Sequence, residues 1–233
     1  MDVATAPRIK SLGLTEYAVV LARMREFTLA RDAETPDELW VVEHPPVYTL
    51  GQGADPKFGP KAANGIAVVQ AERGGEITYH GPGQAVIYTM VDIGRRGIKV
   101  KAFVHLLEQC VINFLTSYGI EAERQAGAPG VYVGSAKIAS LGIRVTRGRA
   151  WHGLALNVDM DLAPFAAIDP CGYPGLKVVQ AREADADFLR RTGDAEKGSR
   201  ENRAHPDQDR AQGAAGQAGV DPRQGGERGH ALL

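Results

Sequence analysis

The sequence predicts an α+β fold in which a mixed, mostly antiparallel sheet is flanked by helices. Short apolar runs bounded by Gly and Pro dominate the middle of the chain, as expected of strands. Connections such as Val145–Ala150 have the length of hairpin turns, which favours antiparallel pairing. Two longer segments show the spacing of amphipathic helices. With 233 residues, 44% of them hydrophobic and 24% charged, the chain has the composition of a soluble globular protein.

The two helices are predicted from apolar residues at intervals of three and four. The first is expected to run from Thr15, as its capping residue, to about Ala30. The second follows Gly97 and stops at Gly119. Its apolar face would carry Val100, Phe103, Val104, Leu107, Val111, Phe114 and Tyr118.

Six apolar runs predict strands, and Pro45 and Pro46 end the first of them in a turn. Alternating side chains in Lys137–Val145 predict a strand with one buried face. The expected strands are Leu39–Glu43, Ile66–Gln70, Ala85–Ile93, Val131–Val133, Lys137–Val145 and Ala155–Val158.

The composition changes near residue 190, which divides the chain in two. Residues 191–233 contain eight glycines, no aromatic residue and few large apolar ones. Such a segment buries too little apolar surface to offset the entropy of ordering its backbone. We therefore expect a folded domain over 1–190 and a disordered, low-complexity tail over 191–233.

Charge and motif content exclude several classes of function. A formal charge of -1 argues against a general nucleic-acid binder, and no apolar run is long enough to span a membrane. The first ten residues lack the apolar core of a secretory signal, so we expect a cytoplasmic protein. The sequence contains neither of two common phosphate-binding glycine loops and no paired-cysteine metal spacing, which makes nucleotide and zinc chemistry unattractive hypotheses.

The two cysteines stand in different contexts. Cys110 lies inside the second helix beside its apolar stripe, which predicts a small buried hydrophobic residue. Cys171 lies in DPCGYPG, where two prolines and two glycines predict a loop that could present the thiol to a cleft. A structural loop cysteine remains the alternative. A nucleophilic thiol, with an ordinary pKa of ~8.5, needs a nearby cation or base.

Lys137 and four histidines are the candidate partners of such a thiol. Lys137 begins an apolar strand, so desolvation would suit its amine to proton exchange, although an ordinary strand lysine has the same pattern. His80 and His152 are flanked by glycines, as in a segment that closely approaches a ligand or in a tight turn. We expect His44 to be a turn or packing residue and His105 to face solvent.

Taken together, five blocks of sequence resemble the octanoyltransferases of lipoate biosynthesis. They are EHPPVYTLGQ from Glu43, RGGEITYHGPGQ from Arg73, GAPGVYV from Gly127, AKIASLGIRV from Ala136 and WHGLALNVDMDLAPFAAIDPCGYPGL from Trp151. The blocks occur in order and lie within residues 12–182. The resemblance implies a fold like that of biotin and lipoate protein ligases, with residues 1–190 as the catalytic acyltransferase domain.

The resemblance also implies roles for particular residues. Cys171 matches the position that carries an acyl thioester, and Lys137 matches its partner. Three segments match the walls of the acyl pocket: Arg73, Gly74, Gly75, Glu76, Ile77, Thr78, Tyr79 and His80; Ser140, Leu141 and Gly142; and Gly153, Leu154 and Ala155.

The implied reaction is transfer of an octanoyl group from octanoyl-acyl carrier protein to the lysine of a lipoyl domain, the first step of protein lipoylation. Acceptors would be the E2 subunits of 2-oxoacid dehydrogenases and the H protein of glycine cleavage. Exchange of a thioester for an amide is downhill, so no ATP, metal or other cofactor is expected. We expect a monomer that binds neither nucleic acid nor membrane.

Three other functions remain open at this point. An ATP-dependent lipoate or biotin protein ligase would share the fold but would not need a nucleophilic cysteine. A non-catalytic adaptor would keep the fold without the chemistry. A hydrolase would pair Cys171 with His80 or His152 and release the acyl group to water.

Overall fold

A computed structural model describes residues 6–55, 60–61, 64–170 and 173–192. Its larger sheet has seven strands in the order β1-β2-β6-β10-β9-β8-β7. β1 and β2 are parallel and every other neighbouring pair is antiparallel, which confirms the predicted α+β class. The strands are β1 (Arg8–Leu14), β2 (Glu38–Glu43), β6 (Gln84–Asp92), β7 (Glu123–Gln125), β8 (Ala128–Val133), β9 (Ala136–Thr146) and β10 (Arg149–Asn157).

A second sheet of three strands lies beside the first and supplies one wall of the site. Its order is β4-β3-β5, with β3 parallel to β4 and antiparallel to β5. All four side chains of β5 are buried, because this strand is covered on both faces. The strands are β3 (Val47–Leu50), β4 (Ala67–Gln70) and β5 (Ile77–His80).

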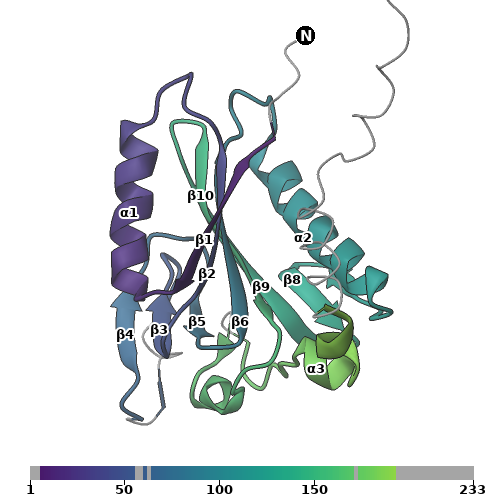
Figure 1. Cartoon of the computed structure of the whole chain (residues 1–233). Helices are drawn as coiled ribbons and strands as arrows, with labels where there is room; N and C mark the ends of the chain where they lie inside the picture. Colours follow the sequence, from purple (N-terminus) through teal and green to yellow (C-terminus); the bar gives the residue numbers. More distant parts are fainter. Residues whose placement is uncertain (1–5, 56–59, 62–63, 171–172, 193–233) are drawn as a thin grey trace, which may run out of the picture. The chain divides into compact units, whose positions relative to one another are not determined.

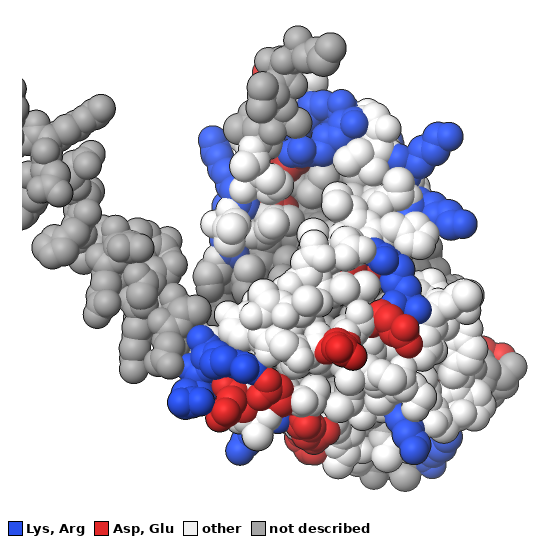
Figure 2. All heavy atoms as spheres, turned by 90° about the vertical axis from the view of Figure 1, so that its right-hand side faces the viewer, with Lys and Arg blue, Asp and Glu red and all other residues white. Residues whose placement is uncertain are grey.

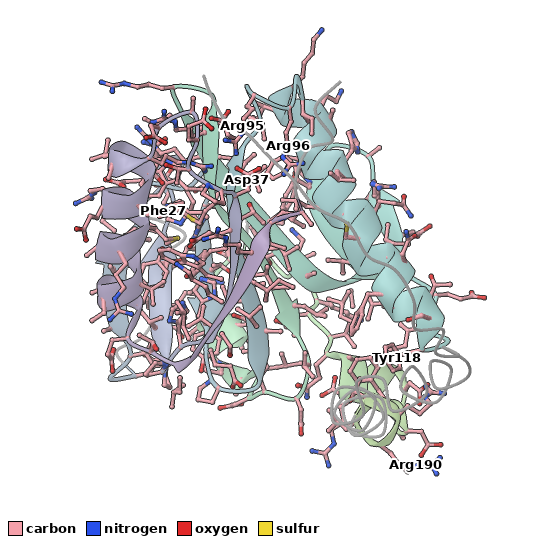
Figure 3. All side chains as sticks on the ribbon, turned by 45° about the horizontal axis from the view of Figure 1, so that its top comes forward. Phe27, Asp37, Arg95, Arg96, Tyr118 and Arg190 are labelled. Atoms are coloured by element: carbon pink, nitrogen blue, oxygen red, sulfur yellow. The ribbon has the colours of Figure 1, made fainter. Side chains whose placement is uncertain are left out.

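Two helices, α1 (Tyr17–Ala30) and α2 (Val100–Ser117), cover opposite faces of the larger sheet (Figure 1). Successive residues of β10 show this division. Leu154 and Leu156 belong to the core cluster under α2, and Ala155 belongs to the cluster under α1. Figure 3 labels Phe27 of α1, whose ring meets that of Trp40 edge to face at 5.7 Å between centroids. A 3-10 turn (Ala163–Ala167) and the short α3 (Ala181–Ala184) follow β10.

The structure confirms both predicted helices and a strand at each of the six predicted runs, and it corrects several details. Thr15 does not cap α1; Glu16 is the capping residue, and the Thr15 hydroxyl donates to the Leu12 carbonyl at 2.8 Å. β9 does not have one buried and one open face, because cover on both sides leaves its later residues half-buried. The strands β1, β3, β5 and β7 were not predicted.

The expected hairpin joins β9 to β10. Thr146 pairs with Arg149 in the antiparallel register, so Arg147 and Gly148 form a two-residue turn. Their φ angles of 52° and 79° are those of the left-handed region that such turns require. This hairpin places the middle of β9 against the middle of β10, where two of the predicted site segments lie.

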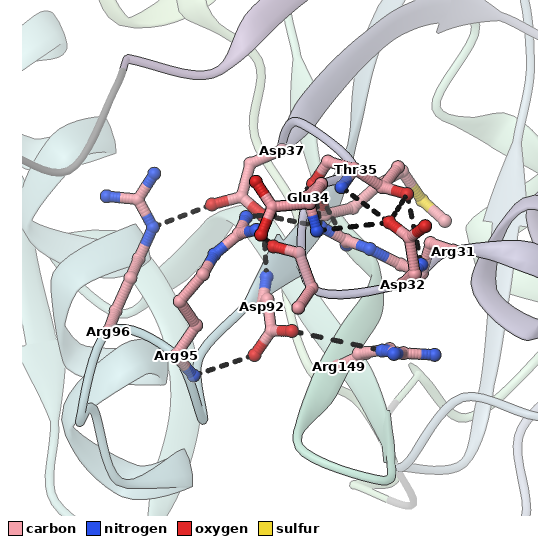
Figure 4. A network of polar contacts seen from close by, with 11 residues as sticks. Arg31, Asp32, Glu34, Thr35, Asp37, Asp92, Arg95, Arg96 and Arg149 are labelled. Atoms are coloured by element: carbon pink, nitrogen blue, oxygen red, sulfur yellow. Dashed lines mark hydrogen bonds and ion pairs between the residues drawn. The ribbon is translucent and has the colours of Figure 1, made fainter.

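A buried ionic cluster at one end of the sheet is centred on Asp37 (Figure 4). The carboxylate accepts hydrogen bonds from Arg31, Arg95 and Arg96 at 2.6–2.8 Å and from the Asp92 amide at 2.8 Å. Burial alone would raise the pKa of Asp37, but these donors together hold it below its usual value. The cluster ties the start of β2 to the end of β6, and Figure 3 shows that its labelled members are grouped together.

No helix in the described part of the chain has the length and apolarity needed to cross a membrane. On the side of the molecule seen in Figure 2, uncharged residues cover most of the described surface, and Lys, Arg, Asp and Glu side chains lie on it singly or in small groups. α2 contributes the exposed apolar side chains Leu106 and Phe114. Of the predicted tail over 191–233, Arg191 and Thr192 are helical, and residues 193–233 lie outside the described residues.

Candidate active site

The three predicted wall segments meet around one cavity, here called the first cavity, with about 490 Å³ of empty space including its opening. The segment before and within β5 forms one wall, and the facing middles of β9 and β10 form another. α1 and β6 close the far side through Tyr17, Val86 and Tyr88. The predicted residues that line it are Arg73, Gly75, Glu76, Ile77, Thr78, His80, Ser140, Leu141, Gly142, Gly153, Leu154 and Ala155.

Two of the fourteen predicted wall residues do not line this cavity. Tyr79 points into a neighbouring cluster, where its ring packs against Tyr48 and Phe165 at 5.6 and 5.4 Å between centroids. Side chains alternate along a strand, so Tyr79 faces away from the side that Thr78 and His80 share. Gly74 lines the adjoining cavity instead.

A pair of glycines makes close packing at the cavity wall sterically feasible. Gly142 of β9 lies opposite Gly153 of β10 in the ladder. A Cβ on Gly153 would fall 2.1 Å from the Ile87 carbonyl oxygen, and one on Gly142 would fall 3.0 Å from the side chain of Arg73. The missing side chain of Gly153 lets β10 lie close to β6. That of Gly142 lets the loop before β5 lie directly on β9, where the Gly74 amide donates to the Ile143 carbonyl at 3.0 Å.

Arg73 fixes the shape of that loop. Its Nη2 donates to both the carbonyl and the hydroxyl of Thr49 at 2.7 Å, and its Nη1 donates to the Gly74 and Glu76 carbonyls at 3.0 and 2.9 Å. Carbonyl and hydroxyl oxygens surround the buried guanidinium, so its bonds hold the backbone of the loop against β3. We read Arg73 as a residue that builds the cavity wall.

Lys137 is buried at a second cavity of about 810 Å³, again including open space. Its side chain is 2% exposed, and Nζ donates to the Pro129 carbonyl at 3.0 Å. Gly130, at φ 139°, leaves room for it, because a Cβ there would lie 2.8 Å from the lysine Cε. The expected desolvation of this lysine is thus observed. The two cavities adjoin, and they share Gly75, Glu76, Leu141 and Gly142 as lining residues.

Cys171 lies outside the described residues, but the chain on both sides of it is described. The Tyr173 amide donates to the Pro170 carbonyl at 3.2 Å, and Tyr173 lines the second cavity together with Lys137. Further along, the Lys137 amide donates to the Lys177 carbonyl at 2.9 Å, and the Val179 amide donates to the Lys137 carbonyl at 3.0 Å. The segment that follows Cys171 is therefore hydrogen-bonded to the strand residue that carries the buried amine.

A buried polar layer on the α1 side of the first cavity was only partly anticipated. His44 donates from Nδ1 to the Thr15 carbonyl at 2.6 Å, so its neutral ring accepts from the Tyr88 hydroxyl at Nε2, at 2.7 Å. His80 donates from Nδ1 to the side-chain carbonyl of Gln84 at 2.7 Å. The expectation that His44 is a packing residue is confirmed, and the glycine-flanked His80 lines the cavity.

Burial keeps this layer uncharged. Desolvation lowers the pKa of His80 and of His152 to about 3 and raises that of Tyr17 to about 12. Desolvation also lowers the pKa of His44 and raises that of Tyr88 well above 10. At neutral pH the histidines are neutral and the tyrosines protonated, so this end of the cavity suits an uncharged ligand.

Sequence reasoning did not predict Tyr17, Val86 and Tyr88 as cavity residues, and it considered His152 only as a candidate partner of the thiol. Tyr17 was assigned to the apolar face of the first helix and Tyr88 to a strand, and both assignments hold. The Tyr88 hydroxyl bonds to His44, on an element distant in sequence, whereas the buried Tyr17 hydroxyl has no partner among the described residues. The periodic pattern contains no signal for either environment. The one available hint was that both apolar positions carry tyrosine, where phenylalanine would fit the pattern equally well, because a buried tyrosine hydroxyl usually has a polar partner.

The predictions for Cys110 and His105 had opposite outcomes. Cys110 is exposed, so the prediction of a buried residue is wrong. The buried line of α2 runs through Phe103, Leu107, Val111 and Leu115, and Cys110 lies off that line toward solvent. His105 faces solvent as expected, where its ring lies 3.3 Å from the Glu108 carboxylate.

Comparison with known proteins identifies the family. Residues 16–180 match the model of the lipoyl protein ligase A/B catalytic domain. An octanoyltransferase of Dechloromonas aromatica is 56% identical over 177 residues, which cover 76% of this chain and 86% of that protein. One from Aromatoleum aromaticum is 56% identical over 175 residues, covering 75% of each. The chain belongs to the octanoyltransferase family.

Among solved structures, lipoate-protein ligase A bound with ATP matches with a TM-score of 0.63 at 16% identity, over 77% of each chain. The expected likeness to the lipoate protein ligase fold is therefore confirmed. Family membership also makes the chain an acyltransferase. Residues 16–180, which match the family model, include every residue that lines the first cavity.

Proposed function

We propose that this protein transfers an octanoyl group from octanoyl-acyl carrier protein to the lysine of a lipoyl domain, through a thioester on Cys171. The observation that carries the proposal is the buried amine of Lys137 on a cavity that adjoins the one built from the three wall segments. The chain around Cys171 supports it, because Tyr173 lines the same cavity as Lys137. The names of the relatives support octanoyl as the acyl group.

In the first half-reaction, the Lys137 ammonium stabilises the Cys171 thiolate. The thiolate attacks the thioester carbonyl of the donor, a sulfur–acyl bond to Cys171 forms, and the bond to the donor's phosphopantetheine sulfur breaks. Lys137 gives its proton to the departing sulfur, which leaves as a neutral thiol. The octanoyl chain lies in the first cavity, where each methylene removed from water contributes about 0.8 kcal/mol.

In the second half-reaction, the neutral amine of Lys137 acts as the base. The neutral form of the acceptor lysine attacks the acyl-Cys171 carbonyl and passes its proton to Lys137. An amide forms, and the thiolate and ammonium of the resting enzyme are restored. One buried amine thus serves as acid and then as base, a role that contributes typically 10²–10⁴-fold to a rate.

The proposed chemistry requires neither ATP nor metal, because the donor thioester is already activated. Among the described residues, no three His, Cys, Asp or Glu side chains are arranged to hold a metal ion. We propose lipoyl domains of 2-oxoacid dehydrogenase E2 subunits and of the glycine cleavage H protein as acceptors. A reducing compartment keeps a free thiol available as a nucleophile, so we place the reaction in the cytoplasm. We propose that residues 1–190 form the catalytic domain and that the protein acts as a monomer.

The proposal is tested by the intact mass of the full-length protein after incubation with octanoyl-acyl carrier protein in the absence of ATP. We expect one octanoyl adduct that hydroxylamine removes and that disappears when a lipoyl domain is added. Cys171→Ser should form no thioester. Lys137→Met, which keeps length but removes the amine, should lower the transfer rate at least 100-fold.

Cys110→Ser is the matched control, because this thiol is exposed on α2 and lines neither cavity. It should transfer octanoyl at the wild-type rate. Equal loss in Cys110→Ser and Cys171→Ser would contradict the assignment of the nucleophile. Transfer that starts only when ATP and free octanoate are supplied would favour a ligase, and acyl release to water without an acceptor would favour a hydrolase.

A further inference from the structure

His152 has two features that the proposed transfer does not use. It lines the first cavity at 1% exposure, and within the described residues neither ring nitrogen has a hydrogen-bond partner. Its backbone adopts φ 62° in the middle of β10, a conformation that is strained for histidine. A buried polar ring that lacks partners destabilises a protein unless something bonds to it.

Tyr17 presents a second buried polar group to the same cavity. Its side chain is 2% exposed, and its hydroxyl has no partner among the described residues. Its ring is stacked on that of His80, with centroids 5.8 Å apart and planes 12° apart, so its position is fixed. Tyr17 and His152 come from elements far apart in sequence, yet both line the first cavity together with Tyr88.

The position of these two groups relative to Lys137 sets what they can contact. Lys137 lines the second cavity, and the residues common to both cavities are Gly75, Glu76, Leu141 and Gly142. Tyr17 and His152 line the first cavity only. An acyl chain whose carbonyl lies near Lys137 would therefore reach them with its far end.

The hydrogen-bonding capacity of the His152 imidazole and the Tyr17 hydroxyl determines which ligand atom they can bind. A neutral imidazole has one N–H donor and one acceptor nitrogen, and a phenol hydroxyl can both donate and accept. Together they complement one uncharged oxygen that also donates and accepts, such as that of a hydroxyl. Neighbouring polar side chains use their atoms elsewhere: His44 bonds Thr15 and Tyr88, and His80 bonds Gln84.

We propose that His152 and Tyr17 form an oxygen-binding subsite at the inner end of the acyl pocket. It holds a water molecule while a plain chain is bound, or the hydroxyl of a chain that ends in one. The subsite makes the pocket tolerant of an ω-hydroxyacyl group that an apolar pocket would reject. It also disfavours plain chains long enough to displace the oxygen, because these leave both side chains unbonded. This inference rests on the proposed acyl transfer.

The test compares matched acyl chains of six to ten carbons on acyl carrier protein, each with and without a terminal hydroxyl. For the wild type, we expect at least one chain length at which the hydroxyl lowers kcat/KM less than threefold. Tyr17→Phe removes one oxygen atom and little volume. At that chain length it should lower the ratio of kcat/KM for the hydroxylated chain to kcat/KM for the plain chain at least tenfold.

Tyr118→Phe is the control, since Tyr118 packs at the end of α2 and lines neither cavity. It should leave the ratio of hydroxylated to plain substrate at the wild-type value. His152→Asn gives a second reading, because asparagine accepts the left-handed conformation but is too short to reach the same oxygen. This variant should lower the ratio as Tyr17→Phe does.

Two results would overturn the proposal: a tenfold loss for every hydroxylated chain with the wild type, or an unchanged ratio in both cavity variants. A crystal structure of the octanoyl-loaded enzyme separates the two sources of oxygen. Water within hydrogen-bond distance of His152 supports the subsite, and its absence there contradicts it. Transfer of plain octanoyl by the wild type tests the proposed function alone, so failure of the subsite is distinct from failure of the reaction.

Discussion

The two buried histidines that line the first cavity, His80 and His152, predict a steep loss of stability in mild acid. Desolvation lowers the pKa of both His80 and His152 from 6.5 to about 3. The folded state therefore keeps both rings neutral at pH 5, whereas the unfolded chain protonates both. Stability is complete above pH 6.5 and is lost as the pH falls from 6.5 toward 3, since the unfolded state binds more protons over that window.

The magnitude follows from the distance between the working pH and the unfolded pKa. At pH 5 the solution lies about 1.5 units below the unfolded pKa, and each unit corresponds to about 1.36 kcal/mol. Each ring therefore lowers the free energy of unfolding by about 2 kcal/mol, and the pair lowers it by about 4 kcal/mol. This figure does not change with the folded pKa as long as that lies well below 5. The stabilisation by ionised Asp37 is lost only as the pH falls below about 3.8, the ordinary pKa of this carboxyl, so it is intact at both pH 7 and pH 5.

The assay is urea-induced equilibrium unfolding of the full-length protein at pH 7 and pH 5, at constant ionic strength. The free energy of unfolding should fall by at least about 4 kcal/mol in the wild type, since burial also lowers the pKa of His44, and by about 2 kcal/mol less in His80→Gln or His152→Asn. His105→Gln removes a solvent-exposed histidine of α2 and should keep the wild-type difference. A wild-type loss below 1 kcal/mol, or the full loss in both cavity variants, would refute the reasoning.

Two further perturbations probe the scaffold. Gly153→Ala places a methyl group 2.1 Å from the Ile87 carbonyl oxygen and should lower the free energy of unfolding in urea by about 3 kcal/mol or more. In Gly53→Ala the new methyl group makes only ordinary van der Waals contacts, so the free energy of unfolding should change by less than about 1 kcal/mol. Near-equal stability of the two variants would show that β6 and β10 can separate without loss. Asp37→Asn leaves buried Arg31 with a weakened partner and should lower the free energy of unfolding by about 3–5 kcal/mol, against less than 1 kcal/mol for the exposed Asp187→Asn. A small effect at Asp37 would mean that Arg31 is solvated in the folded state.

Local periodicity explains which parts of the fold could be predicted. The helices and six strands have apolar repeats strong enough to be read without tertiary context. The wall segments, in contrast, were predicted from the resemblance to octanoyltransferases. β5 was missed because ITYH has no alternation: it is buried on both faces, so the period-two signal vanishes. β1 was missed for the opposite reason, since its side chains are almost all exposed at the edge of the sheet.

The error at Cys110 shows the limit of a helical stripe drawn from sequence. The stripe included Val100 and Phe114, which the structure leaves 48% and 41% exposed. Only contacts with the sheet decide how a helix is rotated about its axis, and here they favour the line from Phe103 to Leu115. When the predicted apolar stripe of a helix is wider than the area in contact with the sheet, the sequence does not predict whether a cysteine beside the stripe is buried.

The residues of the candidate site differ in whether their roles depend on neighbouring sequence or on the assembled fold. Gly142, Gly153 and Arg73 have roles that are local: two positions where no side chain fits, and one side chain that holds its own loop. The roles of Tyr17 and His152 depend on α1 and β10 approaching one cavity, which is a property of the assembled core. Their buried hydroxyl and imidazole would be a defect in a purely structural core, and the strained backbone of His152 would add to it. Both features persist beside the cavity where an acyl chain is proposed to bind, and that coincidence is the physical reason to expect a function for them.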